Sequence, residues 1–294
     1  MTFSALRREL ISVFNSEAAC VPEERDAKHY ADAVICSRFG IDFSQLIMKA
    51  DDIVPDKEIN ECVSMIRRVS AGEPVQYVCG EAPFYGKMFF VDRSVLIPRH
   101  DTEVLLKEVL DRASQICGND NAAGNAKRLS ILDLCTGSGI LAVCIKSDLP
   151  GAKVYASDIS EKALSVASKN ALRHEADVSF ILSDLFESFP QDDRFDIIVS
   201  NPPYVSNAEY DVLDSSVRCF EPSLALIGGE DGLDFYRSIV SNAPRYIKRG
   251  GWLCLEIGDT QAASVSGMLI RRGFKEVTVT RDIAGRDRVV CGKL

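Results

Sequence analysis

The sequence predicts an α/β protein in which a small N-terminal helical bundle precedes a doubly wound, seven-stranded sheet. Two observations predict this fold. Residues 1–80 repeat apolar side chains at three- and four-residue steps, whereas residues from about 129 onward alternate short β-branched runs with helical segments. With 294 residues, the chain is long enough for two domains.

The bundle is predicted from helical periodicity and helix punctuation. The predicted helices cover residues 3–14, 27–39, 43–50 and 57–71. Gly40 follows the second helix as a stop signal, and Asp42 and Asp56 are the expected N-caps of the last two. We therefore assign residues 1–80 to a helical domain.

A change in amino-acid composition marks the end of the bundle. Residues 81–98 are rich in aromatic and β-branched side chains around Gly86-Lys87, which predicts a β-hairpin linker. A helix is expected from about Asp101, and the polar stretch 118–126 is expected to be a loop. Residues 99–294 then form the second predicted domain.

Seven strands are predicted in this second domain, mostly separated by helical segments. They cover residues 129–134, 154–158, 178–183, 195–200, 251–257, 275–280 and 288–292. In doubly wound sheets, ligands bind beyond the carboxyl ends of the parallel strands. The residues directly after each strand are therefore the candidates for function.

Composition excludes several classes of protein. The 34 basic and 43 acidic residues give a net charge of −9, which argues against a protein that binds nucleic acid through a global positive field. No apolar run is long enough to span a membrane, and the charged N-terminus is not typical of a signal peptide. Ten scattered cysteines without a Cys-x-x-Cys pair indicate free thiols and a reducing cytoplasm. Three distant histidines indicate no metal site.

The loop after the first predicted strand has the pattern of a cofactor site. It reads Asp133-Leu-Cys-Thr-Gly-Ser-Gly139, and its glycines allow a sharp turn and close approach of a ligand to the helix that follows. Asp158 ends the next strand, where a carboxylate can accept hydrogen bonds from ribose hydroxyls. The expected cofactor-binding residues are Cys135, Thr136, Gly137, Ser138, Gly139, Asp158, Asp184, Leu185 and Asn201.

Two cofactor classes use such a loop. A dinucleotide fingerprint needs a third small residue, a position that Ala142 occupies here. Asp133 and the Thr-Gly-Ser-Gly sequence instead resemble the S-adenosylmethionine (SAM) loop of class I methyltransferases. The remaining alternative is a tight turn that binds no ligand.

The reaction motif follows the fourth predicted strand as Asn201-Pro-Pro-Tyr204. An amide or exocyclic amine nitrogen is a poor nucleophile, so an enzyme must hold both of its N–H groups. The Asn201 side-chain oxygen and the Pro202 carbonyl can accept them, and Tyr204 offers a flat face for stacking. Pro203 biases the preceding backbone toward an extended conformation.

These assignments make Asn201, Pro202 and Tyr204 the expected catalytic residues, and Asn201, Pro202, Pro203 and Tyr204 the expected substrate-binding residues. None of them titrates near neutral pH. We therefore expect positioning without a base, and a pH profile without a limb near 6 to 7. The alternative for this motif is a rigid turn without function.

Together, the motifs resemble those of the bacterial peptide chain release factor glutamine methyltransferases. The resemblance runs from about residue 72 to the C-terminus. It rests on residues 72–77, 84–86, 95–99, 133–139, 201–204, 221–226, 228–233 and 282–288. It implies a cytoplasmic, SAM-dependent enzyme with a Rossmann-like fold that methylates the amide nitrogen (N5) of the glutamine in the Gly-Gly-Gln motif of class 1 release factors. It also implies that the helical domain binds the release factor.

Two positions depart from the family pattern. His100-Asp101-Thr102 stands where Pro-Glu-Thr is usual, and Cys135 stands where glycine is common. The first departure keeps an acid, and from the second we expect that position 135 needs no positive φ. The competing hypotheses are an N6-adenine or other nucleic-acid amino methyltransferase, a non-catalytic SAM- or protein-binding module, and a nicotinamide oxidoreductase.

Overall fold

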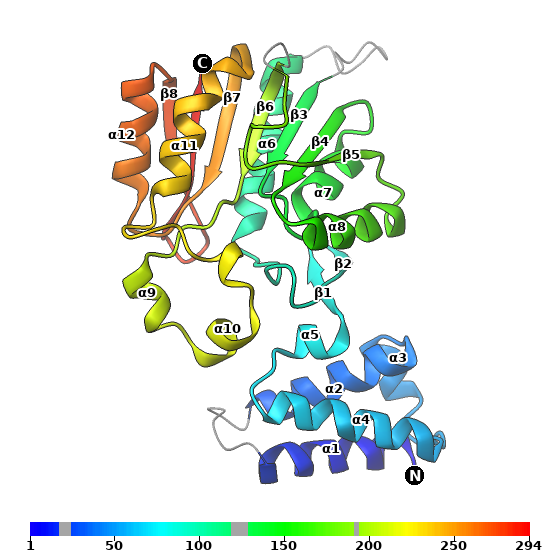
Figure 1. Ribbon diagram of the computed structural model, residues 1–294. Helices are drawn as coiled ribbons and strands as arrows, with labels where there is room; N and C mark the ends of the chain where they lie inside the picture. Colours follow the sequence, from blue (N-terminus) through cyan, green and yellow to red (C-terminus); the bar gives the residue numbers. More distant parts are fainter. Residues whose placement is uncertain (18–24, 119–128, 191–193) are drawn as a thin grey trace. The chain divides into compact units, whose positions relative to one another are not determined.

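The computed structural model describes residues 1–17, 25–118, 129–190 and 194–294. The chain divides into two compact units (Figure 1). The helical unit consists of Met1–Glu81, Val91–Arg93 and Asp214–Glu221. The sheet unit consists of Ala82–Phe90, Ser94–Leu213 and Pro222–Leu294.

The helical unit packs short helices around one apolar core (Figure 1). Its first helices are α1 (Phe3–Glu17), α2 (Arg25–Phe39), α3 (Phe43–Met48), α4 (Asp56–Ser70) and α5 (Val75–Cys79). The apolar face predicted for α1 is buried, as are the facing side chains of Ile35 on α2 and Ile66 on α4. All four predicted helices are confirmed; α5, only 5 residues long, was missed because it is too short to show a period.

The predicted N-caps have different outcomes. Asp42 is confirmed: its carboxylate accepts from the Gln45 N–H at 2.8 Å, and the Gln45 side chain accepts from the Asp42 N–H at 2.9 Å. Asp56 is wrong as a cap, because extended Pro55 is the N-cap and Asp56 is the first helical residue. Asp56 therefore acts on α4 through the helix dipole, which favours acids in the first turn.

A buried glutamate joins separate segments of the helical unit. Glu73 accepts from both Nε and Nη2 of Arg68 at 2.8 Å and from Nη2 of Arg93 at 2.9 Å. Hydrogen bonding to Arg68 and Arg93 lowers the pKa of Glu73, although its burial opposes the shift. The Arg93 guanidinium also lies 4.9 Å from the ring centroid of Phe220, which ends α10 (Ser215–Phe220). Residues from outside the 1–80 range therefore belong to this unit.

The predicted hairpin is present as β1 (Glu81–Phe84) and β2 (Lys87–Phe90). Tyr85 and Gly86 at its turn both have positive φ, the conformation that a two-residue hairpin favours. Asn170 anchors β2: its side chain accepts from the Phe90 N–H at 2.6 Å and donates to the Phe90 carbonyl at 3.0 Å. The same amide donates to the Ser138 carbonyl at 2.8 Å, so it ties the hairpin to the predicted cofactor loop.

The sheet has seven strands in the order β5-β4-β3-β6-β7-β9-β8 (Figure 1). They are β3 (Ser130–Leu134), β4 (Lys153–Asp158), β5 (Val178–Leu182), β6 (Phe195–Ser200), β7 (Ile247–Glu256), β8 (Lys275–Arg281) and β9 (Asp287–Lys293). The first five are parallel, and β9 pairs antiparallel with both β7 and β8. The predicted seven strands and doubly wound class are confirmed. β7 begins earlier than predicted because the polar residues 248–250 resemble a turn.

Helices cover both faces of this sheet and bury an apolar layer on each. One layer involves α6 (Thr102–Cys117), α7 (Ile140–Asp148) and α8 (Glu161–Arg173). The other involves α11 (Asp234–Asn242) and α12 (Ala262–Arg272). The helix expected from Asp101 is thus α6. Gly118 ends it, and residues 119–126 of the predicted loop lie outside the described residues.

The remaining short elements are α9 (Asn207–Asp211), η2 (Ser223–Ala225) and η3 (Ala243–Arg245). The chain crosses from β5, at one side of β3, to β6, at the other side of β3. This reversal is the switch point at which doubly wound sheets bind ligands.

Candidate active site

The strand register brings the predicted site residues to one edge of the sheet. Leu134 on β3 pairs with Ser157 on β4 and with Ser200 on β6, and Ser200 pairs in turn with Leu255 on β7. The residues that follow these four are Cys135, Asp158, Asn201 and Glu256. They therefore lie in a row along the carboxyl edge of the parallel strands, one strand spacing of about 4.8 Å apart.

The loop after β3 is a tight left-handed turn. Cys135, Gly137 and Gly139 all have positive φ. The expectation that Cys135 needs no positive φ is therefore wrong: its φ is 58°, a conformation that favours glycine. Hydrogen bonds hold the turn, because the Thr136 hydroxyl donates to Asp133 Oδ2 at 2.6 Å and the Thr136 N–H donates to the Ser157 carbonyl at 2.9 Å.

Gly139 is required for packing as well as for its φ of 80°. A Cβ at Gly139 would lie 2.9 Å from the Ala167 Cβ, so the start of α7 can approach α8 only with glycine here. At Gly137, in contrast, a Cβ would meet no atom of the described residues within 4 Å. The loop therefore packs against the protein at Gly139 and leaves space at Gly137.

Asp158 is oriented by backbone donors. Its Oδ2 accepts from the Gly137 N–H and its Oδ1 from the Ser160 N–H, both at 2.9 Å. Burial raises the pKa of Asp158, while these backbone hydrogen bonds oppose the rise. A carboxylate has about four lone-pair sites, and the backbone donors do not fill all of them, so the side chain can also accept a hydrogen bond from a ligand hydroxyl.

Asp184 and Leu185 follow β5, as predicted, but differ in their surroundings. Asp184 is exposed, and its charge contributes, with those of Asp158 and Asp133, to raising the pKa of the Cys135 thiol, for which burial is the main cause. Leu185 is half-buried, has a positive φ and packs against the core layer that contains α11 and α12. Acidic groups from three strand ends thus surround the β3 loop.

The Asn201-Pro-Pro-Tyr204 motif leaves β6 at the centre of the row. Pro202 and Pro203 are buried, while Asn201 and Tyr204 are half-buried. The Asn201 amide nitrogen donates to Thr102 Oγ1 at 3.3 Å. Burial raises the pKa of Tyr204 to about 12, so its phenol stays neutral at physiological pH. The motif thus presents carbonyl oxygens, an oriented amide and a neutral aromatic ring.

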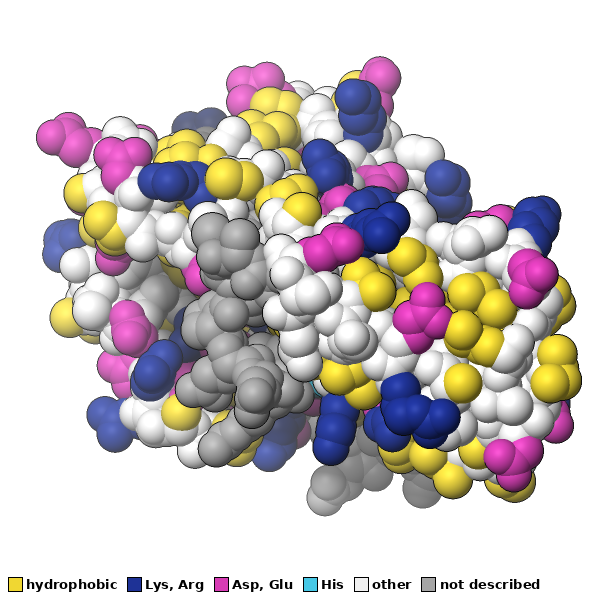
Figure 2. Space-filling view, turned by 90° about the horizontal axis from the view of Figure 1, so that it is seen from below, with side chains coloured by type: hydrophobic (Ala, Val, Ile, Leu, Met, Phe, Trp, Pro, Cys, Tyr) yellow, Lys and Arg dark blue, Asp and Glu magenta, His cyan; other side chains and the backbone are white. Residues whose placement is uncertain are grey.

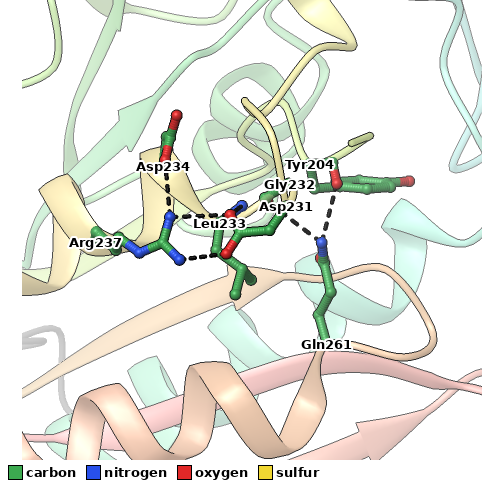
Figure 3. A network of polar contacts seen from close by, with 7 residues as sticks. All are labelled: Tyr204, Asp231, Gly232, Leu233, Asp234, Arg237 and Gln261. Atoms are coloured by element: carbon green, nitrogen blue, oxygen red, sulfur yellow. Dashed lines mark hydrogen bonds and ion pairs between the residues drawn. The ribbon is translucent and has the colours of Figure 1, made fainter. Parts of the chain in front are cut away.

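A second loop and a glutamine hold the end of this motif in place. Gln261 Nε2 donates to the Tyr204 carbonyl at 3.0 Å and to the Gly232 carbonyl at 3.2 Å, as Figure 3 shows. A Cβ at Gly228 would lie 2.7 Å from the Pro203 carbonyl oxygen. Position 228 must therefore be glycine for the 228–233 loop to pack against the motif. Arg237 on α11 donates hydrogen bonds to Asp231 and Asp234, and so links the same loop to α11 (Figure 3).

Sequence analysis missed four residues of this site: Thr102, Asn170, Gln261 and Glu256. Glu256 is the most consequential, because it is 1% exposed and ends β7 directly beside Asn201. Burial raises the pKa of Glu256 to about 7. The available signal was an acid at the end of the apolar run 252–255, since an acid there must be buried. The expectation of a pH profile without a limb near 6 to 7 considered only Asn201, Pro202 and Tyr204, and Glu256 lies outside that set.

Charged residues on β9 and before α6 complete this side of the site. Arg288 Nη2 lies 3.2 Å from both Asp101 Oδ2 and Asp282 Oδ2. The Asp101 that departs from the family pattern therefore forms an ion pair with a buried arginine. The Arg288 charge lowers the pKa of Glu256, against the effect of burial.

The described part of the chain lacks two features, a cluster of metal ligands and an apolar helix of membrane-spanning length. No group of three or more His, Cys, Asp or Glu side chains there could hold a metal ion. No helix among the same residues is long and apolar enough to cross a membrane. Nine cysteines lie in the described ranges, and all nine are free thiols; Cys20 lies outside them.

Comparison with protein families and known proteins gives consistent matches. The family model described as methyltransferase small domain matches residues 98–220, and the model described as PrmC N-terminal domain matches residues 17–80. The release factor glutamine methyltransferase of Geobacter sulfurreducens is 40% identical over 269 residues, which cover 92% of this chain and 90% of that protein. Its counterpart in Thermodesulfovibrio yellowstonii is 40% identical over 261 residues, covering 88% and 90%.

Solved structures share the fold. The hMettl16 catalytic domain, in complex with the MAT2A 3'UTR hairpin 6, has a TM-score of 0.54 at 14% identity and covers 81% of this chain and 82% of that one. A methyltransferase from Pyrococcus furiosus has a TM-score of 0.51 at 15% identity, covering 71% and 90%. With the family matches, these structures confirm the predicted class I methyltransferase fold.

Proposed function

The chain belongs to the release factor glutamine methyltransferase family, and from this premise we propose its complete reaction. It transfers a methyl group from SAM to the side-chain amide nitrogen (N5) of the glutamine in the Gly-Gly-Gln motif of class 1 peptide chain release factors. The observation that carries this proposal is the register that sets the Cys135–Gly139 loop and Asn201-Pro-Pro-Tyr204 on adjacent strands.

The residues at the β3 and β4 ends fit a nucleoside cofactor. The space at Gly137 and the remaining lone pairs of Asp158 suit a ribose, and Asp184 and Leu185 suit an adenine amino group and ring. Thr136, Ser138 and Asn201 complete the proposed SAM site. When bound, SAM supplies an electrophilic methyl group on a sulfonium.

The motif residues hold the nucleophile. An amide nitrogen has a delocalised lone pair, so its orientation limits the reaction. Asn201 Oδ1 and the Pro202 carbonyl accept its two N–H groups, and the Tyr204 ring stacks on the amide plane. These acceptors also stabilise the positive charge that develops on the nitrogen, so positioning and electrostatics supply the catalysis. The products would be S-adenosylhomocysteine and a neutral N-methyl amide, after one N–H proton has left the nitrogen for solvent.

The helical unit recognises the release factor. The match of residues 17–80 to the PrmC N-terminal domain supports this assignment, as do hydrophobic side chains that this unit exposes. On and after α3, Phe43 is 53%, Ile47 53%, Met48 77% and Ile53 75% exposed. Figure 2 shows that hydrophobic side chains on the face it displays lie in groups among charged ones. Such groups are typical of protein contact surfaces.

Transfer of labelled methyl from SAM to a purified, unmethylated release factor tests the reaction. We expect label on the Gly-Gly-Gln glutamine, mapped by mass spectrometry, and its loss in Asn201→Ala. Asn207→Ala, an exposed asparagine on α9, is the matched control and should retain activity. Label in DNA or RNA instead of the release factor would contradict the proposal and establish the nucleic-acid alternative.

The role of the helical unit is tested by comparing a full-length release factor with a short Gly-Gly-Gln peptide. The double variant Phe43→Ser and Ile47→Ser should raise KM for the protein substrate about tenfold and leave KM for the peptide unchanged. Leu172→Ser, at an exposed leucine on α8, is the control. Equal effects on both substrates would show that the helical unit does not bind the release factor.

A further inference from the structure

Glu256 is a buried acid whose position is costly for the fold. It ends the apolar strand β7, is 1% exposed, and one of its carboxylate oxygens, Oε2, has no hydrogen-bond partner among the described residues. A buried acceptor without a donor destabilises a protein. Nothing in the packing of β7 requires an acid at this position. We therefore expect the role of Glu256 to follow from the side chains that it faces.

Glu256 faces the side chains of Asn201 and Thr102. Both hydrogen-bond with its carboxyl and lower its pKa, and Asn201 Nδ2 also donates to Thr102 Oγ1 at 3.3 Å. Thr102 is 1% exposed at the start of α6, so water does not compete for its hydroxyl. The three side chains form one polar group in the sheet unit, in which Glu256 and Thr102 are buried and Asn201 is half-buried.

The chemistry of a carboxylate determines how the Asn201 amide must lie. An ionised carboxylate only accepts hydrogen bonds, so the edge of the amide that faces it must carry the NH₂ group. The opposite flip would direct the amide oxygen at the carboxylate oxygens. With NH₂ toward Glu256 and Thr102, Oδ1 points away from them, free to accept an N–H from a substrate.

The surrounding charges allow Glu256 to ionise. Arg288 on β9 favours the carboxylate, whereas Asp101, before α6, opposes it. The charge of Glu256 also raises the pKa of two phenols, those of Tyr204 and Tyr236. The Tyr236 hydroxyl donates to the main-chain carbonyl of Glu256 at 2.8 Å. Asp282 shares Arg288 with Asp101.

We propose that Glu256 is a positioning residue that holds the Asn201 amide with Oδ1 toward the substrate nitrogen. The inference rests on the proposed function, since it assigns Oδ1 the substrate N–H. Glu256 itself does not touch the substrate: its carboxylate selects one of the two flips of Asn201, and Thr102 supports the same choice. Loss of the charge should therefore lower turnover with little change in SAM affinity.

The test compares Glu256→Gln with the wild type, using the full chain, SAM and an unmethylated release factor. Glutamine has nearly the same shape but carries both a donor and an acceptor, so it no longer selects a flip. We expect kcat to fall 10- to 100-fold while the Kd for SAM stays within threefold. Asp196→Asn is the matched control, because Asp196 is also a buried acid but bonds Lys248 and the Ser130 N–H instead. It should retain kcat.

The pH profile separates positioning from general destabilisation. In the wild type, kcat should rise with pH through a limb near 7 as Glu256 ionises, and Glu256→Gln should lack this limb. Thr102→Ser, which keeps the hydroxyl, should have nearly wild-type kcat, and Thr102→Val should not. Glu256→Gln with wild-type kcat and an unchanged limb would overturn the proposal. If Glu256→Gln does not fold, equal kcat in Thr102→Ser and Thr102→Val would do so.

A measurement independent of turnover distinguishes failure of this inference from failure of the proposed function. In protein labelled with ¹⁵N-asparagine, the side-chain NH₂ signal of Asn201, identified by its loss in Asn201→Ala, should titrate with a midpoint near 7. It should not titrate in Glu256→Gln. Absence of methyl transfer with this titration present refutes only the reaction, whereas transfer without the titration refutes only the role of Glu256.

Discussion

Glu73 in the helical unit and Glu256 in the sheet unit are both buried, but their surroundings are opposite. In the helical unit, Glu73 is held by Arg68 and Arg93, and its pKa is lowered. In the sheet unit, Glu256 is more completely buried, has an oxygen without a partner, and has its pKa raised to about 7. Glu73 therefore favours folding when ionised, whereas Glu256 opposes it.

The difference shows where the molecule tolerates an electrostatic cost. Asp133 shares the pattern of Glu256: it is buried below the β3 loop, and burial raises its pKa to about 7. Asp158 has a raised pKa as well. All three acids lie at the carboxyl ends of parallel strands, where perturbed acids are typical of functional sites. In the helical unit, which we assign to recognition, the buried acid Glu73 is paired with arginines instead.

The largest expected effect comes from placing a second acid beside Glu256. Asn201→Asp removes the NH₂ group and sets two carboxyls against each other, so we expect kcat to fall about 10³-fold. In the double variant Asn201→Asp with Glu256→Gln, the glutamine can donate to the new acid, and kcat should recover about tenfold. Methyl transfer by the wild type, the two single variants and the double variant forms a double-mutant cycle. Strictly additive losses would show that the two side chains do not interact.

Stability as a function of pH should differ in sign between the two glutamates. The pKa of Glu256 rises from an ordinary 4.5 to about 7 in the folded state, so the folded chain binds the proton more tightly than the unfolded chain. The free energy of unfolding contributed by Glu256 is therefore greatest below about pH 4.5 and decreases by about 3 kcal/mol as pH rises to 7. The contribution of Glu73 is present above 4.5 and is lost as pH falls below it.

Denaturant unfolding of the wild type and Glu256→Gln between pH 4.5 and 8 measures the first contribution. The difference between the two proteins should change with pH as stated, because the other groups cancel. A difference that does not depend on pH would mean that Glu256 is not perturbed, and the contrast with Glu73 would disappear.

A smaller effect is expected for Glu73→Gln. It leaves Arg68 and Arg93 without their shared carboxylate, but both arginine side chains are about half exposed. We therefore expect a loss of about 1–2 kcal/mol in the free energy of unfolding, rather than the larger cost of breaking a fully buried pair. Turnover of a short Gly-Gly-Gln peptide should stay within twofold of wild type. A large loss of peptide turnover would show that the two glutamates do not divide stability and catalysis as described.

The smallest effect concerns the strained turn of the β3 loop. Cys135 has a φ of 58°, which costs a residue with a Cβ about 1 kcal/mol relative to glycine. Cys135→Gly should therefore unfold at a free energy about 1 kcal/mol higher than Cys135→Ala, since both remove the thiol and differ only in the Cβ. Equal stabilities in thermal unfolding would place the strain elsewhere.

Much of the fold could be predicted because its signals are local. The apolar face of α1, the capping residue Asp42 and the seven strands are each encoded within a few neighbouring residues. Asp56 was assigned wrongly because Pro55 and Asp56 both suit the start of a helix, and only the backbone shows which one precedes it. Prediction thus succeeded for the long helices and the strands, missed the short helix α5, and misplaced the starts of α4 and β7.

The site could be predicted only where a motif is contiguous. The β3 loop and Asn201-Pro-Pro-Tyr204 each form a continuous string, and the register then brings them together. Thr102, Glu256 and Gln261 meet the motif from distant parts of the chain, and each is isolated in the sequence. The positive φ of Cys135 was missed because glycine is the residue that indicates a positive φ in a sequence, and this position holds a cysteine.

The pairing of Leu134 with Ser200 has a consequence for how this protein can change over time. The loop proposed to hold the methyl donor and the motif proposed to hold the acceptor start one strand apart, and that spacing comes from peptide hydrogen bonds rather than from side chains. Substitutions inside the sheet can therefore accumulate without altering the reach between donor and acceptor. Accumulated core substitutions should therefore unfold the protein before they change the distance between the proposed donor and acceptor sites.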